Sequence, residues 1–109
     1  MKNNNSTDRR IFARIPIMLP IRFLASGQEK EHEAKTVDVS ANGIGFLSKG
    51  ELSPLTPLEM WLQLPENRGT FYTRGKVVWS SPTTETGEQR NGIRLEKAEL
   101  MGLAPVLWR

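Results

Sequence analysis

The chain has 109 residues, which is enough for one domain and too few for two. Its hydrophobic fraction of 38% can fill one buried core, and the absence of cysteine excludes disulfides and thiolate chemistry. The formal net charge of +3 lies entirely in residues 1–14, because the acidic and basic side chains of the remainder balance. A basic arm on a neutral body favours a local anionic partner over a broad nucleic-acid surface.

No apolar run reaches membrane-spanning length, and residues 1–7 are polar and lack the apolar segment of a signal peptide. A chain without cysteine also suits a reducing compartment. We therefore expect a soluble, cytoplasmic protein with no membrane insertion. Residues 1–7 are predicted to be disordered, because they have no apolar surface to bury.

Apolar and polar side chains alternate from Ile15 to Leu24, which is the period of a β-strand, and Pro20 places this strand at an edge or a bulge. Further strands are predicted at residues 34–39, 43–47, 58–64, 71–79 and 91–95. Residues 25–31 and 80–89 are predicted loops, and Asn42-Gly43 is a strong turn signal. Residues 96–103 favour a helix of a few turns at most.

Six short strands separated by turns, with little helix, predict an antiparallel barrel or sandwich. Closing the sheet would also protect its edges from pairing with other chains.

The sequence offers little for catalysis. His32 is the only histidine, and its charged surroundings predict a solvated loop residue. Without cysteine it cannot complete any usual zinc site, and no glycine-rich nucleotide motif is present. We expect no enzymatic activity, no catalytic residue, no metal site and no cofactor.

Three arginines, Arg9, Arg10 and Arg14, precede the first predicted strand. The guanidinium group donates paired hydrogen bonds to phosphate oxygens, and its flat face stacks on aromatic bases. These residues could therefore close around a ligand that carries both phosphates and bases. A solubilising tail would have the same composition.

A second motif, Asp38-Val39-Ser40-Ala41-Asn42-Gly43, ends the second predicted core strand. Asp38 and Ser40 project to the same side of an extended chain. The carboxylate can accept two N–H bonds from the Watson–Crick edge of guanine, and the hydroxyl adds a donor or an acceptor. Gly43 lets the backbone turn and a ligand approach. An ordinary tight turn uses the same residue types.

Together and in this order, the two motifs resemble the paired signature of the PilZ family, Arg-Arg-x-x-x-Arg followed by Asp/Asn-x-Ser-x-x-Gly. Residues 75–79 and 91–95 resemble the family's penultimate and closing barrel strands. The resemblance covers nearly the whole chain beyond residue 7.

The resemblance implies an all-β fold, a six-stranded antiparallel barrel over residues 8–109. That domain would include a flexible arginine arm at residues 8–14 and at most a short C-terminal helix. It implies cyclic di-GMP as the ligand. Arg9, Arg10 and Arg14 would clasp the phosphates and stack on guanine, Asp38 and Ser40 would read a guanine, and Gly43 would make room. Trp79 either stacks on a base or is a core or surface tryptophan.

The implied function is a receptor whose arm orders over the ligand and presents a new surface to an unidentified effector protein. The protein would be a monomer or a ligand-dependent dimer, and no DNA or RNA partner is expected. Two alternatives remain: a small barrel that binds RNA or single-stranded DNA, and a barrel of this fold that binds no nucleotide and serves as a protein-interaction module.

Overall fold

The computed structural model describes residues 14–83, 87–97 and 100. Arg9 and Arg10, the stretch predicted to be disordered and most of the predicted C-terminal helix lie outside these residues. No α-helix is present in the part of the chain that is described, and nothing there is helical over a length that could cross a membrane.

The secondary structure consists of short strands joined by turns. In chain order the elements are β1 (Ile15–Pro16), β2 (Pro20–Ala25), β3 (His32–Ser40), β4 (Gly43–Ser48), β5 (Pro57–Gln63), the 3-10 turn η1 (Pro65–Asn67), β6 (Thr70–Pro82) and β7 (Gln89–Leu95).

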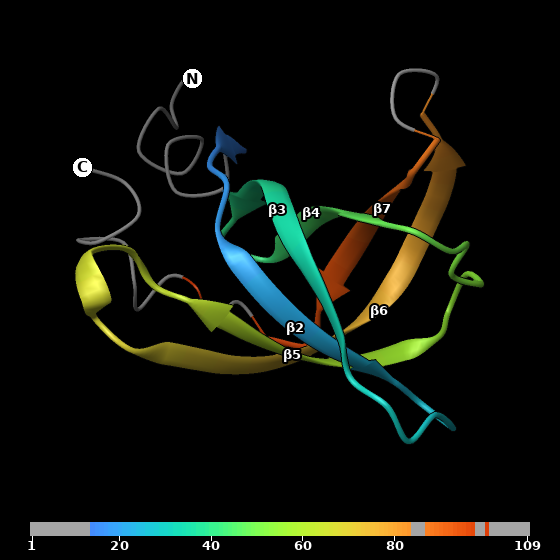
Figure 1. Ribbon diagram of the computed structural model, residues 1–109, viewed down its shortest axis with the longest axis horizontal. Helices are drawn as coiled ribbons and strands as arrows, with labels where there is room; N and C mark the ends of the chain where they lie inside the picture. The colour runs from blue at the N-terminus through green and yellow to red at the C-terminus, as the bar shows by residue number, and fades with distance from the viewer. Residues whose placement is uncertain (1–13, 84–86, 98–99, 101–109) are drawn as a thin grey trace, which may run out of the picture.

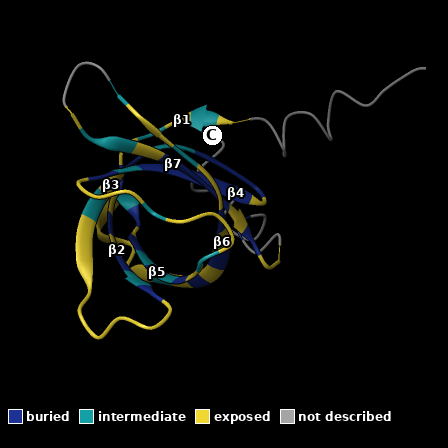
Figure 2. Cartoon of the chain, turned by 90° about the vertical axis from the view of Figure 1, so that its right-hand side faces the viewer, coloured by how far each residue is buried: buried dark blue, intermediate teal, exposed yellow. Residues whose placement is uncertain are grey.

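The strands form one closed antiparallel barrel (Figure 1). The sheet runs β1-β3-β2-β5-β6-β7-β4, and an additional pairing of β3 with β4 closes it. Six strands make the barrel, and the two-residue β1 is an extra strand on β3. In the view of Figure 2 the strands form a ring, and buried residues alternate with more exposed ones along β2, β5 and much of β6. The barrel prediction is confirmed.

The first predicted strand is interrupted, which corrects the sequence prediction. The ladder stops after Pro16 and resumes at Pro20, and the buried Thr36 of β3 bridges the gap. The Thr36 hydroxyl accepts a hydrogen bond from the Leu19 N–H at 2.8 Å and donates one to the Ile17 carbonyl at 2.6 Å. A side chain thus satisfies the backbone groups that strand pairing leaves open.

Two loop predictions are also wrong in part. Residues 80–82 belong to β6 and pair with residues 89–91 of β7, so the hairpin extends beyond its apolar segment. His32 opens β3 rather than lying in a loop; it is exposed, and its ring stacks on Phe23 with centroids 5.4 Å apart. In both places, pairing with a neighbouring strand holds residues in a β-strand although their polar composition had indicated a loop.

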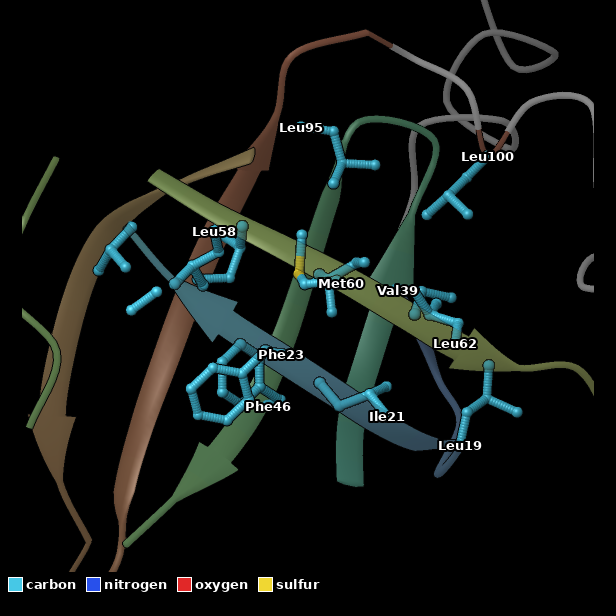
Figure 3. Close-up of a cluster of buried hydrophobic side chains, with 14 residues drawn as sticks. Leu19, Ile21, Phe23, Val39, Phe46, Leu58, Met60, Leu62, Leu95 and Leu100 are labelled. Carbon is cyan, nitrogen blue, oxygen red and sulfur yellow. The ribbon is translucent and has the colours of Figure 1, made fainter. Parts of the chain in front are cut away.

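The interior is filled by one apolar cluster to which six of the seven strands contribute (Figure 3). Within it Phe23 and Phe46 pack against each other with ring centroids 4.9 Å apart. The buried members are Leu19, Ile21, Phe23, Ala25, Val39, Ile44, Phe46, Leu58, Met60, Leu62, Val77, Ile93, Leu95 and Leu100. These include the alternating apolar positions of the predicted strands.

Two β-bulges determine which side chains of β3 and β6 leave the core. The register shifts between Thr36 and Asp38 and again between Val77 and Trp79. Without the extra residue, strict alternation from the buried Thr36 and Val77 would point Asp38 and Trp79 inward. Each bulge reverses that alternation, so both side chains lie on the outer face.

Candidate functional site

The outer face of the barrel carries a row of four residues on four neighbouring strands. Asp38 of β3 pairs with Gly45 of β4, Gly45 pairs with Gly92 of β7, and Gly92 pairs with Trp79 of β6. We call this set the Asp38–Trp79 row. A carboxylate and an indole therefore stand at its two ends, with two glycines between them.

The two glycines allow both end residues to lie down against the sheet. A Cβ at Gly45 would come within 2.5 Å of Asp38 Oδ1, and a Cβ at Gly92 would collide with the indole of Trp79. Neither glycine has a left-handed φ, so each is needed for close approach and not for backbone conformation. Asp38 and Trp79 thus lean over the glycines toward each other.

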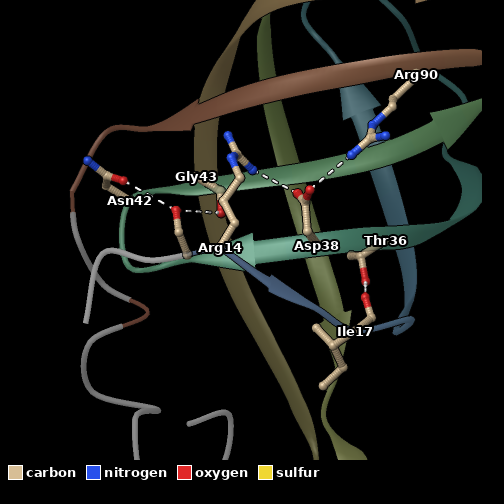
Figure 4. A network of polar contacts seen from close by, with 8 residues as sticks. Arg14, Ile17, Thr36, Asp38, Asn42, Gly43 and Arg90 are labelled. Carbon is tan, nitrogen blue, oxygen red and sulfur yellow. Dashed lines mark hydrogen bonds and ion pairs between the residues drawn. The ribbon is translucent and has the colours of Figure 1, made fainter. Parts of the chain in front are cut away.

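Asp38 is held by two arginines from distant parts of the chain (Figure 4). Arg14 Nη1 lies 2.7 Å from Asp38 Oδ1, and Arg90 Nη2 lies 3.0 Å from Asp38 Oδ2. The carboxylate side chain is only 15% exposed, whereas each arginine side chain is 49% exposed. A carboxylate offers about four lone-pair sites, so each oxygen keeps capacity for a further donor.

The turn after β3 lies beside Arg14. The Ser40 hydroxyl is buried and donates toward Asn42 Oδ1 at 3.4 Å and the Gly43 carbonyl at 3.5 Å. A Cβ at Gly43 would lie 3.5 Å from Arg14 Nη2. That distance is an ordinary van der Waals contact, whereas the same Cβ would lie closer to the Ile93 carbonyl oxygen, at 3.2 Å, and to Ser40 Oγ, at 3.3 Å. Gly43 therefore fits closely against the neighbouring strand and the turn, to which the Ser40 hydroxyl contributes.

A pocket of about 250 Å³ opens between this turn and Trp79. It is lined by Arg14, Asn42, Gly43, Val78, Trp79, Gly92, Ile93 and Arg94. This volume is below the ~300–1,000 Å³ of sites that enclose a drug-sized ligand, so the pocket suits one planar ring system rather than a whole dinucleotide. A larger hollow of about 660 Å³ lies over other strands and includes Arg22, Lys35 and Trp61, but none of the predicted site residues.

The structure brings together most of the predicted residues that it describes. Arg14, Asp38 and Gly43 are neighbours, and Trp79 lines the same pocket as Arg14 and Gly43. Trp79 is 40% exposed, which excludes the core alternative for this residue.

Sequence reasoning missed Arg90, Gly45 and Gly92. Arg90 directly precedes the predicted closing strand, and Gly45 follows Gly43 by two positions, but these local signals are weak. Their relation to Asp38 and Trp79 depends on the register of β4 against β7, which no local pattern specifies.

Comparison with protein-family models finds a match to the PilZ domain over residues 8–100. The chain belongs to the PilZ family. The match includes the positions of all three predicted arm arginines and of the Asp38-to-Gly43 motif. No curated protein matches the chain at the level of sequence.

Solved structures with the same fold include other PilZ domains. The PilZ domain of YcgR from Escherichia coli, solved with c-di-GMP, has a TM-score of 0.72 and 14% identity, over 92% of this chain and 89% of that one. The Bacillus subtilis inhibitor of motility MotI/DgrA has a TM-score of 0.71 and 16% identity, over 99% of this chain and 49% of that one. This chain therefore spans about half the length of the Bacillus protein.

A third similar structure is the PlzA protein of Borreliella burgdorferi, solved in complex with c-di-GMP. It has a TM-score of 0.55 and 11% identity, over 83% of this chain and 47% of that one. At these identities the likenesses show a shared PilZ fold.

Proposed function

We propose that this chain is a receptor for cyclic di-GMP that binds along the Asp38–Trp79 row. The observation that carries the proposal is the meeting of a largely buried carboxylate, an arginine from each side of it and an exposed indole over a glycine surface. Family membership and the two c-di-GMP complexes of similar fold support the same ligand.

The chemistry of the ligand matches these groups. Guanine presents adjacent N1–H and N2–H donors, which the two oxygens of Asp38 can accept together. The flat faces of Trp79 and of the Arg14 guanidinium can stack on a base. The two phosphodiester groups carry two negative charges, and Arg9, Arg10 and Arg14 are the arginines proposed to neutralise them.

Arg14 is already paired with Asp38, so ligand binding would replace this ion pair by contacts between Arg14 and the ligand. The Arg14–Asp38 pair is partly exposed, and such pairs stabilise a fold by only about 0.2–1 kcal/mol. Hydrogen bonds to charged groups contribute about 1.5–3 kcal/mol each, so new bonds to phosphate and guanine can offset the loss. Arg14 stands directly before β1, where the arm joins the barrel.

The proposed output is a change of surface at this junction. When the arm closes over the ligand, residues 8–14 and the barrel face beside them form a surface that the free protein lacks. An effector protein of unknown identity, or a second copy of the chain, would recognise that surface.

Calorimetric titration with cyclic di-GMP tests the ligand, with GTP and cyclic di-AMP as controls. We expect selective heat for cyclic di-GMP and a rise in Tm that grows with ligand concentration. The control variant is Arg22→Ala, because the Arg22 side chain is as exposed as that of Arg14 and pairs with Glu31, which is not among the proposed site residues. No heat and no Tm shift at high ligand concentration would overturn the proposal and leave the nucleic-acid and protein-interaction alternatives.

The same titration against single-stranded RNA separates the nucleic-acid alternative. Binding through many phosphate contacts weakens steeply as salt rises. A steep salt dependence for RNA, with no response to cyclic di-GMP, would favour that alternative.

A further inference from the structure

We infer that Arg90 is a positioning residue that holds the Asp38 carboxylate in the orientation needed to distinguish guanine from related bases. The inference rests on the proposed function and goes beyond it, because Arg90 belongs neither to the arginine motif nor to the Asp38-to-Gly43 motif. It assigns Arg90 to selectivity and not to phosphate binding.

The geometry leaves the carboxylate little freedom. Arg90 donates to Oδ2 of Asp38 at 3.0 Å. Oδ1 lies against Gly45, so close that a Cβ on Gly45 would be only 2.5 Å from it. Asp38 is therefore fixed at one oxygen by a charged donor and kept close to the sheet at the other by a missing side chain. Arg90 comes from β7, one strand beyond Gly45, so it reaches Asp38 across β4.

The two arginines that pair with Asp38 have different proposed roles. Arg14 precedes β1 and is proposed to turn to the ligand, whereas Arg90 lies within β7, where strand pairing with both neighbours fixes its backbone. One lone pair on each oxygen of Asp38 stays available while Arg90 remains bound. Guanine can then donate N1–H and N2–H to a carboxylate whose plane is already set.

A pair of ligands can measure this orientation directly. Cyclic di-IMP carries hypoxanthine in place of guanine, so it keeps N1–H and both phosphates but lacks the 2-amino group. A correctly oriented carboxylate accepts both guanine donors, and we expect it to favour cyclic di-GMP over cyclic di-IMP by about tenfold. A carboxylate that rotates freely gains less from the second donor.

The test compares these two affinities in Arg90→Met, Arg90→Lys and Gly45→Ala. Methionine keeps the apolar stem of Arg90 but removes its charge and donors, and lysine restores both. We expect the tenfold preference to fall toward onefold in Arg90→Met, to be largely retained in Arg90→Lys and to fall in Gly45→Ala. Arg22→Met and Gly50→Ala are the controls and should keep the preference. Arg22 pairs with Glu31 and not with Asp38, and a Cβ at Gly50 meets open space.

The result that overturns the inference is an equal loss of affinity for both ligands in Arg90→Met, with the preference unchanged. Arg90 would then act only as a positive charge. Thermal unfolding of each variant verifies that the barrel is intact. If Gly45→Ala fails to fold, the two Arg90 variants still decide the matter.

A ligand-free readout distinguishes failure of this inference from failure of the proposed function. Three-bond NMR couplings of Asp38 report its χ1 rotamer without any nucleotide. We expect one rotamer in the parent protein and rotamer averaging in Arg90→Met. A single unchanged rotamer in Arg90→Met overturns the positioning role even if neither dinucleotide binds. Absence of binding by the parent protein overturns the proposed function alone.

Discussion

Trp79 lies against Gly92, its paired residue on the neighbouring strand, so closely that any side chain at Gly92 would displace the indole. The bulge at Val78 turns the tryptophan outward, and the glycine lets it lie flat beside the pocket. This contact connects the proposed base-stacking surface to one backbone position 13 residues further along the chain.

Gly92→Ala should therefore weaken cyclic di-GMP binding through Trp79. Stacking of a base on an aromatic side chain contributes about 1–3 kcal/mol, so displacing the ring should cost roughly 5- to 150-fold in affinity. Calorimetry measures the loss, and Gly50→Ala is the control because it introduces no contact. An unchanged affinity in Gly92→Ala would remove Trp79 from the site.

Arg14→Ala should weaken binding at least about tenfold while the domain remains folded. Removing a charge-assisted hydrogen bond from a desolvated site costs about 1.5–3 kcal/mol. Asp38 keeps its ion pair with Arg90 in this variant, so loss of the partly exposed Arg14–Asp38 pair should affect folding little. Calorimetry and thermal unfolding of the same sample measure the two effects. Arg10→Ala should behave similarly, and parent-like affinity in both variants would contradict the assigned roles.

Ligand should slow amide hydrogen exchange in the arginine arm. If residues 8–14 close over cyclic di-GMP, their N–H groups become protected, because ordering the segment makes opening less frequent. Exchange mass spectrometry with and without ligand measures this, and the peptide that contains residues 49–56 serves as an internal reference. Equal exchange rates in the arm under both conditions would contradict the proposed switch.

Thr36→Val should destabilise the barrel without a direct effect on ligand contacts. Valine has nearly the same shape, but it cannot replace the buried hydrogen bond from Leu19 N–H or the partly buried one to the Ile17 carbonyl. Unsatisfied buried backbone groups cost about 1–3 kcal/mol each, and urea unfolding should show a loss of that order. Thr70→Val, at an exposed position, is the control and should change the free energy of unfolding little.

Tyr72 should titrate above its ordinary pKa of 10.0, because its hydroxyl donates to Glu59 Oε1 at 2.6 Å and this bond favours the protonated form. The bond therefore supports the fold below pH 10, and that contribution is lost as the pH rises through the raised pKa. Tyr72 is the only tyrosine, so absorbance near 295 nm follows it alone. Glu59→Gln should lower the midpoint and Glu66→Gln should not. Equal midpoints in all three proteins would exclude the bond.

Much of the barrel can be predicted from local patterns in the sequence. Alternation from Ile21 to Phe23 and from Leu58 to Leu62 follows the two-residue period of a strand, so the inward positions can be predicted from neighbouring residues. Asn42-Gly43 correctly marks the turn between β3 and β4, although neither residue adopts the positive φ that this dipeptide tolerates. The two motifs with Arg14 and Asp38 identify the family through residue order alone, and the family model confirms it.

The set of residues that make up the site cannot be predicted from local patterns, because it depends on pairing between strands that are distant in the chain. A single extra residue at Val37 and another at Val78 reverse the side to which Asp38 and Trp79 point, and each bulge exists only relative to a partner strand. The register of β4 against β7 then sets Gly92 beside Gly45 and brings Arg90 within reach of Asp38. Sequence determined the strands and the motif residues, whereas the closed barrel decided which distant residues complete the site, because register is a property of two strands and not of one.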